Sequence, residues 1–278
     1  MGGEFRVTNS VVSGRDGDIP IRDYEPTNPT AHPPLLWVHG GGFALGGLDM
    51  VESDAPARYL AARGRWVRTI HYRLAPNIGP FRNPRLGAAP GRFPEAHHDV
   101  IDVAKALTDV AGRIHIGGAS AGANLVAGAL LSMRDAGERM PVSALLIYGT
   151  FHSELPDNPE VESGLRGLVA RWLFNPAMTR RIALNYVGQE SGLAEPYAFP
   201  GGAPLAGFPP SLTVDASNDR LRRSGHQFHG ELRAAGIEAE ELVVDGRHGF
   251  LGSPRKAAFA AGMTAIEAWL AARDLTAA

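Results

Sequence analysis

A strand, a sharp turn and a helix around Ser120 constrain the fold more than any other part of the chain. A short apolar run at 114–116 predicts a buried strand, and residues 121–136 predict a helix that ends at Gly137. Between them lies Gly-Ala-Ser-Ala-Gly at 118–122. Such a turn holds its serine in a strained backbone conformation and exposes the hydroxyl above the strand ends. We therefore predict that Ser120 is a catalytic nucleophile.

The two glycines of this turn have a steric reason. A side chain at Gly118 or Gly122 would collide where the strand and the departing helix pass close together. The short pattern alone is weak evidence, because the chain contains 34 glycines. The rest of the chain must therefore supply a base, an acid and donors for an oxyanion.

Strands alternate with helices along most of the sequence. The expected strands are 5–12, 19–24, 35–39, 66–71, 114–116, 144–148, 211–215 and 241–244, and the expected helices are 50–63, 94–109, 121–136, 222–235 and 254–273. This alternation predicts one α/β domain over residues 1–278, with a mostly parallel central sheet, helices on both faces and an antiparallel N-terminal edge. Residues 151–208 differ: they are rich in proline and show one convincing helix, at 177–187, so we interpret them as an insertion over the strand ends.

The composition excludes several classes of protein and site. The chain has no cysteine, which excludes disulfides, thiol nucleophiles and cysteine metal sites. A net charge of −2 gives no general attraction to nucleic acid or to anionic membranes. No apolar run is long enough to span a membrane, and the first 25 residues lack the apolar core of a signal peptide. We therefore expect a cytoplasmic protein, unless processing removed a leader.

Glycines follow the expected strand at 35–39 as well. In a parallel sheet, active residues gather on the loops at the carboxyl ends of the strands. The run Gly40-Gly41-Gly42 lets backbone N–H groups turn inward without obstruction from side chains. Together with the N–H of Ala121, at the start of a helix, they could stabilise an oxyanion. An ordinary glycine turn is the alternative.

Position selects one of the ten histidines as the base. His248 follows the last expected strand, and a neutral imidazole there can take the serine proton and later protonate the leaving group. The pairs His97–His98 and His226–His229 could ligate a metal, but solvated or half-buried helix faces explain them more simply. We predict no metal site.

The acid is expected after the strand that lies between the nucleophile and the base in the chain. Asp215 and Asp219 both follow this strand, and we favour Asp219, because Asp215 closes the strand and could simply cap the turn. Its role would be to hold His248 in the correct tautomer and to stabilise the imidazolium. Asp245 is a weaker candidate. The order serine, aspartate, histidine is that of the α/β-hydrolases.

Five motifs in this order resemble the hormone-sensitive-lipase-like esterases. They are His-Gly-Gly-Gly-Phe at 39–43, Tyr-Arg-Leu-Ala-Pro at 72–76, Gly-Ala-Ser-Ala-Gly at 118–122, Asp-Arg-Leu-Arg at 219–222 and His-Gly-Phe at 248–250. The resemblance implies an α/β-hydrolase fold, serine carboxylesterase activity and no cofactor. It also implies that the N–H groups of Gly41, Gly42 and Ala121 form the oxyanion hole, while His39 braces its loop without carrying a proton.

The chain departs from the family pattern in the layer that covers the site. Family members usually begin with a helical cap, whereas the first strand here starts near Phe5, so we expect that cap to be missing or cut off. The link from Pro76 to Phe93 is also longer than usual. We hypothesise that residues 151–208 and a second covering loop at 77–92 supply the cover. The candidates for lining the pocket are Phe43, Trp172, Phe174 and Phe250, although ordinary packing is the favoured explanation for each of them.

These observations predict a serine carboxylesterase that hydrolyses short- to medium-chain acyl esters through an acyl-enzyme on Ser120. An amidase, arylformamidase or lactonase with the same triad is the alternative. A non-catalytic small-molecule receptor on the same fold is a third possibility, since this fold can serve as a receptor when the triad is broken. The expected partner is a small ester, with no nucleic acid; a homodimer is left open.

Overall fold

The computed structural model describes residues 3–28, 30–77, 79 and 82–275. Its strands are β1 (Phe5–Gly14), β2 (Gly17–Pro26), β3 (Leu35–Val38), β4 (Val67–Ile70), β5 (His115–Ala119), β6 (Ala144–Ile147), β7 (Ser211–Asn218) and β8 (Ala239–Arg247). Its helices are α1 (Val51–Ala61), α2 (Glu95–Ala111), α3 (Ala121–Asp135), α4 (Pro159–Gly164), α5 (Gly167–Trp172), α6 (Pro176–Val187), α7 (Arg222–Ala234) and α8 (Ala257–Leu275), with 3₁₀ turns η1 (Glu190–Ala194) and η2 (Phe250–Gly252).

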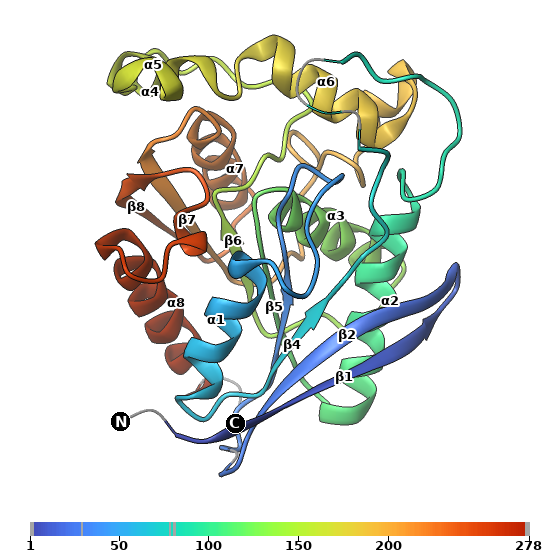
Figure 1. Cartoon of the computed structure of the whole chain (residues 1–278), viewed down its shortest axis with the longest axis vertical. Helices are drawn as coiled ribbons and strands as arrows, with labels where there is room; N and C mark the ends of the chain where they lie inside the picture. The colour runs from blue at the N-terminus through green and yellow to red at the C-terminus, as the bar shows by residue number, and fades with distance from the viewer. Residues whose placement is uncertain (1–2, 29, 78, 80–81, 276–278) are drawn as a thin grey trace.

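The strands form one sheet in the order β1-β2-β4-β3-β5-β6-β7-β8 (Figure 1). The strand β1 pairs antiparallel with β2, and β2 pairs antiparallel with β4. The remaining pairs, from β4 through β8, are parallel. This arrangement confirms the predicted parallel sheet with an antiparallel N-terminal edge.

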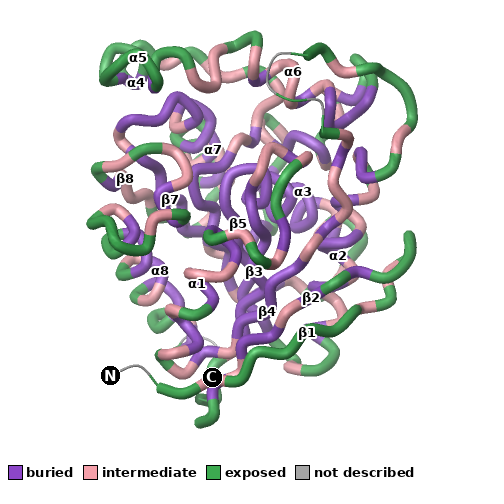
Figure 2. The backbone as a smooth tube through the Cα atoms, in the orientation of Figure 1, coloured by how far each residue is buried: buried purple, intermediate pink, exposed green. Residues whose placement is uncertain are grey.

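Side chains that alternate along each central strand build two cores, one on each face of the sheet. Leu36 and Val38 of β3 belong to the core beneath α2, α3 and α7, whereas Leu35 and Trp37 belong to the core beneath α1 and α8. In Figure 2 the central strands are therefore buried throughout, while β1 at the edge is largely exposed. Burial of both faces explains why the parallel strands read as continuous apolar runs.

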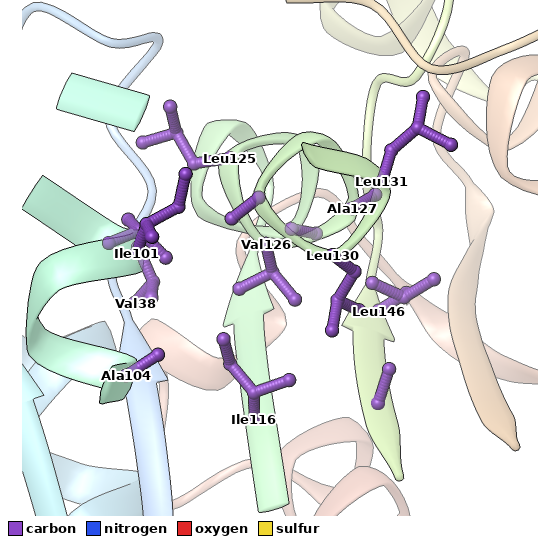
Figure 3. Packing of buried hydrophobic residues seen from close by; sticks show 14 of the residues in the cluster. Val38, Ile101, Ala104, Ile116, Leu125, Val126, Ala127, Leu130, Leu131 and Leu146 are labelled. Carbon is purple, nitrogen blue, oxygen red and sulfur yellow. The ribbon is translucent and has the colours of Figure 1, made fainter. Parts of the chain in front are cut away.

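The helix α3 is the most deeply buried helix behind the sheet. Val126 and Leu130 point down onto Ile116 of β5 and Leu146 of β6 (Figure 3). Its far side is covered too, because a Cβ on Gly128 would lie 2.1 Å from the carbonyl oxygen of Tyr197. A helix enclosed in this way fixes the position of the residue that precedes it, which is Ser120.

Residues 151–208 contain more helix than the sequence predicted. The structure has α4, α5 and α6 there, where a single helix was expected. The prediction was wrong because α4 and α5 span six residues each, too few to show a helical period. A local signal was present, since Asn158 before Pro159 caps α4 by accepting a hydrogen bond from the N–H of Val161.

Among the described residues, no helix combines the length and the apolar character needed to cross a lipid bilayer.

Replacing Leu146 by alanine tests the core between α3 and the sheet. Leu146 is 1% exposed, and its loss should lower the free energy of unfolding by about 2–5 kcal/mol, measured by urea denaturation. The control is Val110→Ala on α2, where the side chain is 71% exposed and the change should stay within about 0.5 kcal/mol. Equal effects of the two substitutions would contradict this packing.

Candidate active site

Ser120 occupies a strained turn between β5 and α3. Its backbone has φ 55° and ψ −121°, in the left-handed half of conformational space that non-glycine residues rarely adopt. Both neighbouring glycines are sterically required: a Cβ on Gly118 would lie 2.5 Å from the backbone of Gly122, and a Cβ on Gly122 would lie 2.2 Å from the carbonyl oxygen of Val38. The strained turn predicted from the sequence is therefore present.

A hydrogen-bonded chain connects three side chains that are far apart in the sequence. The Oγ of Ser120 lies 2.9 Å from Nε2 of His248, and Nδ1 of His248 lies 2.7 Å from Oδ2 of Asp219. Since the carboxylate accepts a hydrogen bond from the N–H at Nδ1, the unprotonated Nε2 faces the hydroxyl. The arrangement can deprotonate Ser120 when an electrophile approaches it.

The pairing of β7 with β8 places the acid beside the base. Both strands extend beyond the expected 211–215 and 241–244, and after an irregularity they pair again at Asn218 and Arg247. Asp219 directly follows β7 and His248 directly follows β8, so the two residues leave the sheet side by side. Asp219 is 2% exposed, and its Oδ1 accepts a hydrogen bond from the N–H of Leu221.

The two other candidate acids lie elsewhere. Asp215 is buried against Gly225, and neither of its oxygens has a hydrogen-bond partner among the described residues. Burial, and next to it the charge of Asp219, raises the pKa of Asp215 well above its ordinary value, which favours the neutral form of this carboxyl. Asp245 is exposed and pairs with Arg166. Of the three aspartates, the structure brings only Asp219 to His248.

The environment of His248 favours its protonated form. Burial lowers the pKa of the imidazole, but the charge of Asp219, the hydrogen bond to it and the charge of Glu52 outweigh burial, so the pKa is raised above 6.5. A base of this kind is well matched to a reaction in which an imidazolium forms transiently.

The glycine loop after β3 faces the same cavity. Gly41 and Gly42 have φ of 108° and 59°, and both line the cavity together with Ser120 and Ala121. The N–H of Ala121 has no acceptor within its helix, because it belongs to the first turn of α3. Among the described residues, no acceptor is found for the N–H groups of Gly41 and Gly42. These amides can hold an oxyanion.

His39 braces this loop from behind. Its Nδ1 donates to the carbonyl oxygen of Gly40 over 2.7 Å, and its ring stacks on Tyr72 with 4.4 Å between the centroids. The hydroxyl of Tyr72 donates to the same carbonyl over 3.0 Å. Burial lowers the pKa of His39 to about 4, so the ring is neutral. These contacts agree with the bracing role that the resemblance implies.

The cavity above Ser120 has a volume of about 450 Å³ and a largely apolar lining. Phe43 and Phe174 line it, and the ring of Phe174 meets His248 edge-on at 4.6 Å. Phe250 instead packs in the core against Tyr148, with 4.9 Å between the ring centroids. Trp172 is half exposed on α5. Two of the four aromatic candidates therefore lie away from the described lining.

Some residues that line the cavity belong to the segments 77–92 and 151–208. Met178 and Ile182 of α6 line it, as do Asn77 and Gly79 from the loop 77–92. Residues 78 and 80–81 of that loop lie outside the described part of the chain. Glu52 also lines the cavity. It was not predicted from the sequence, because an isolated acidic residue in a helix carries no signal that identifies it.

The chain is similar to several known proteins. Residues 35–252 match the model of a family described as having the alpha/beta hydrolase fold. The chain is 30% identical to carboxylesterase NlhH of Mycobacterium tuberculosis over 85% of this chain and 72% of that protein, and 28% identical to the arylesterase of Saccharolobus solfataricus over 86% and 75%. A solved esterase from Pyrobaculum calidifontis matches with a TM-score of 0.81 at 28% identity, covering 98% of this chain and 86% of that one.

The glycine requirement of the turn can be tested with two alanine substitutions. Gly122→Ala should lower the melting temperature and abolish labelling of Ser120 by a fluorophosphonate, because the new Cβ would lie 2.2 Å from the oxygen of Val38. The control is Gly230→Ala in α7, where a Cβ meets nothing within 4 Å, and it should stabilise the protein by up to about 1 kcal/mol. Wild-type labelling of Gly122→Ala would refute the close crossing.

Proposed function

This chain belongs to the hormone-sensitive-lipase-like carboxylic ester hydrolases of the α/β-hydrolase fold, and we propose that it cleaves esters through an acyl-enzyme on Ser120. The observation that carries the proposal is the chain of hydrogen bonds from Ser120 through His248 to Asp219, which opens into a cavity bordered by backbone amides. In this proposal Ser120 is the nucleophile, His248 the base and Asp219 the residue that orients the base.

Acylation begins when Nε2 of His248 takes the proton of Ser120 as Oγ attacks the ester carbonyl. The carbonyl oxygen becomes an oxyanion, which the N–H groups of Gly41, Gly42 and Ala121 stabilise. His248 then donates its proton to the departing alkoxide, and an alcohol leaves. Asp219 neither gains nor loses a proton during these steps, and its charge stabilises the imidazolium.

Deacylation repeats these steps with water. His248 removes a proton from a water molecule, the resulting hydroxide attacks the acyl carbonyl, and the same amides stabilise the second oxyanion. Collapse of this intermediate returns the proton to Oγ of Ser120 and releases the carboxylic acid. Each half of the cycle uses the same donors, so one preorganised loop serves both transition states.

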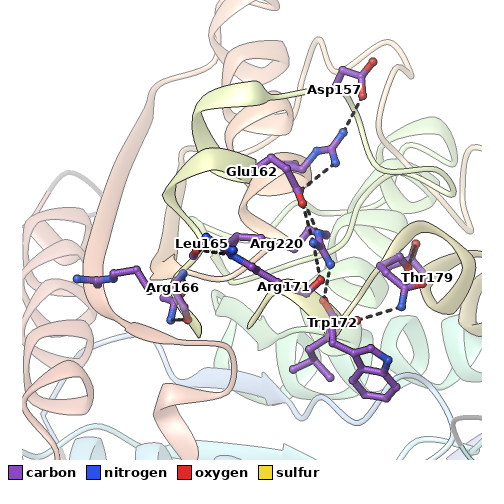
Figure 4. A network of polar contacts seen from close by, with 12 residues as sticks. Asp157, Glu162, Leu165, Arg166, Arg171, Trp172, Thr179 and Arg220 are labelled. Carbon is purple, nitrogen blue, oxygen red and sulfur yellow. Dashed lines mark hydrogen bonds and ion pairs between the residues drawn. The ribbon is translucent and has the colours of Figure 1, made fainter. Parts of the chain in front are cut away.

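The cover over the cavity, formed by residues 77–92 and 151–208, is part of this proposal. Arg220, the neighbour of Asp219, supports it by linking the cover to the acid-bearing loop (Figure 4). Its guanidinium forms a bidentate pair with Glu162 of α4, at 3.0 and 2.6 Å. It also donates to the carbonyl oxygens of Arg171 and Leu173, on either side of the end of α5.

An apolar cavity of about 450 Å³ suits acyl groups of short to medium length. The cytoplasmic location expected from the sequence belongs to the same proposal, and cell fractionation would test it. Homodimerisation is left open, and light scattering of the purified protein would decide it.

Two substitutions test the catalytic assignments. Ser120→Ala should remove all labelling by a fluorophosphonate and lower kcat by about 10⁶-fold, because no other group can carry the acyl chain. Asp219→Asn should lower kcat by about 10⁴-fold, because the amide favours the wrong tautomer of His248. Asp245→Asn is the matched control, since its side chain is exposed, and it should retain wild-type rates. Turnover by purified Ser120→Ala would overturn the mechanism.

A series of substrates tests the bond and the chain length. We expect p-nitrophenyl esters from acetyl to octanoyl to be hydrolysed with higher kcat/KM than the palmitoyl ester, because the long chain exceeds the cavity of about 450 Å³. Matching p-nitroanilides should react far more slowly than the esters. Hydrolysis of the anilides faster than of the esters would indicate an amidase. A wild-type protein that fluorophosphonates do not label would indicate a non-catalytic receptor.

A further inference from the structure

Glu52 is a buried acid in the wall of the active-site cavity. It is the second residue of α1 and is 4% exposed. Its two carboxylate oxygens contact two different parts of the site: Oε1 accepts the N–H of Gly40 over 2.8 Å, and Oε2 accepts the hydroxyl of Tyr148 over 2.7 Å. Burial of a carboxylate is costly unless its oxygens are paired in this way.

The contact with Gly40 fixes the loop that carries the oxyanion donors. A Cβ on Gly40 would lie 2.5 Å from Oε1 of Glu52, so the carboxylate occupies the space next to the main chain. On its other side, the carbonyl of Gly40 is held by His39 and Tyr72. Because a peptide group is planar, fixing this carbonyl also fixes the direction of the N–H of Gly41. Glu52 on one side, and His39 and Tyr72 on the other, thus hold the two peptide groups that precede the oxyanion hole.

The contact with Tyr148 supports the base. Tyr148 has a positive φ of 38°, and its ring packs edge-on against His248 with 5.0 Å between the centroids. The hydrogen bond to Glu52 holds this strained residue and therefore supports the position of the imidazole. The charge of Glu52 also raises the pKa of His248, after the opposing effect of burial and the larger contribution of Asp219.

We propose that Glu52 is a positioning residue that holds the oxyanion loop and the base histidine at their working distance and adds a second negative charge beside the imidazole. This inference rests on the proposed function of the site. Among the described residues, the polar and titratable groups that face His248 are those of Asp219, Glu52, Tyr148 and Ser120. Burial raises the pKa of Tyr148 well above its ordinary value, so Glu52 and Asp219 supply the negative charge.

The side chain of Glu52 can be changed without releasing the start of α1. The backbone oxygen of Glu52 accepts the indole N–H of Trp37 over 3.0 Å, a contact that does not involve the carboxylate. Tyr72 also senses the charge of Glu52, but burial, the largest influence, raises the pKa of Tyr72 well above its ordinary value and keeps it neutral. A neutral isostere therefore leaves the charge of the neighbouring tyrosines unchanged.

Two variants separate the charge of Glu52 from its hydrogen bonds. Glu52→Gln keeps an acceptor for Gly40 and removes the charge, whereas Glu52→Ala removes both. The matched control is Asp54→Asn on the same helix, whose carboxylate pairs with Tyr24 and Arg58 away from the site. For each variant we would measure kcat, KM, the pH profile of kcat/KM, the affinity for a phenylboronic acid and the melting temperature.

The expected results follow from what the charge of Glu52 and its hydrogen bonds each contribute. The base must be neutral, so kcat/KM falls as the pH drops through the pKa of His248. Since the charge of Glu52 raises that pKa, Glu52→Gln should move the acid limb of the profile to lower pH, with kcat reduced by up to about tenfold. Glu52→Ala should lower kcat by about 10²-fold, as for the loss of an oxyanion donor, with little change in KM. Affinity for the boronic acid should fall in parallel.

The inference is overturned if the acid limb of Glu52→Gln coincides with that of the wild type and of Asp54→Asn. It is equally overturned if Glu52→Ala keeps kcat within about twofold of the control. If Glu52→Ala does not fold, the pH profile of Glu52→Gln decides. Failure of the proposed function is a different result: the wild type itself would then show no hydrolysis that depends on Ser120.

Discussion

The close passage of α3 behind the end of β3 is the constraint on which the site depends. The helix can approach only because Gly122 has no side chain, since a Cβ there would lie 2.2 Å from the carbonyl oxygen of Val38. This approach places the loop leaving β3 beside the nucleophile, since a Cβ on Gly40 would lie 3.0 Å from the Cβ of Ser120. One steric contact therefore brings the attacking oxygen and the oxyanion amides together before any substrate binds.

The other half of the site depends on strand register. Pairing of Asn218 with Arg247 sets Asp219 and His248 at the same height above the sheet. A shift of register by one residue would direct these side chains differently, because side chains alternate along a strand. The nucleophile is thus placed by helix packing and the base by strand pairing. The two meet because α3 begins, and β7 and β8 end, at the same edge of the sheet.

Much of this could be predicted from the sequence, because the relevant signals are local. The turn at Ser120, the glycines at 40–42 and the residues after β7 and β8 each lie within a few positions of a strand end. What could not be predicted depends on contacts between distant segments. Glu52 and Tyr148 are 96 residues apart, and no pattern in either segment reveals their hydrogen bond. The inward turn of Phe250 toward Tyr148 rather than the cavity depends on the same packing.

Two carboxyl groups act on the base, those of Asp219 and Glu52, and a third, that of Asp215, lies apart from it. Asp219 and Glu52 each accept a hydrogen bond from a backbone amide. Asp215, four residues before Asp219, has no such donor among the described residues, and burial raises its pKa well above the ordinary value. The charges that raise the pKa of His248 are therefore those of Asp219 and Glu52, which together with the hydrogen bond to Asp219 outweigh the opposing effect of burial.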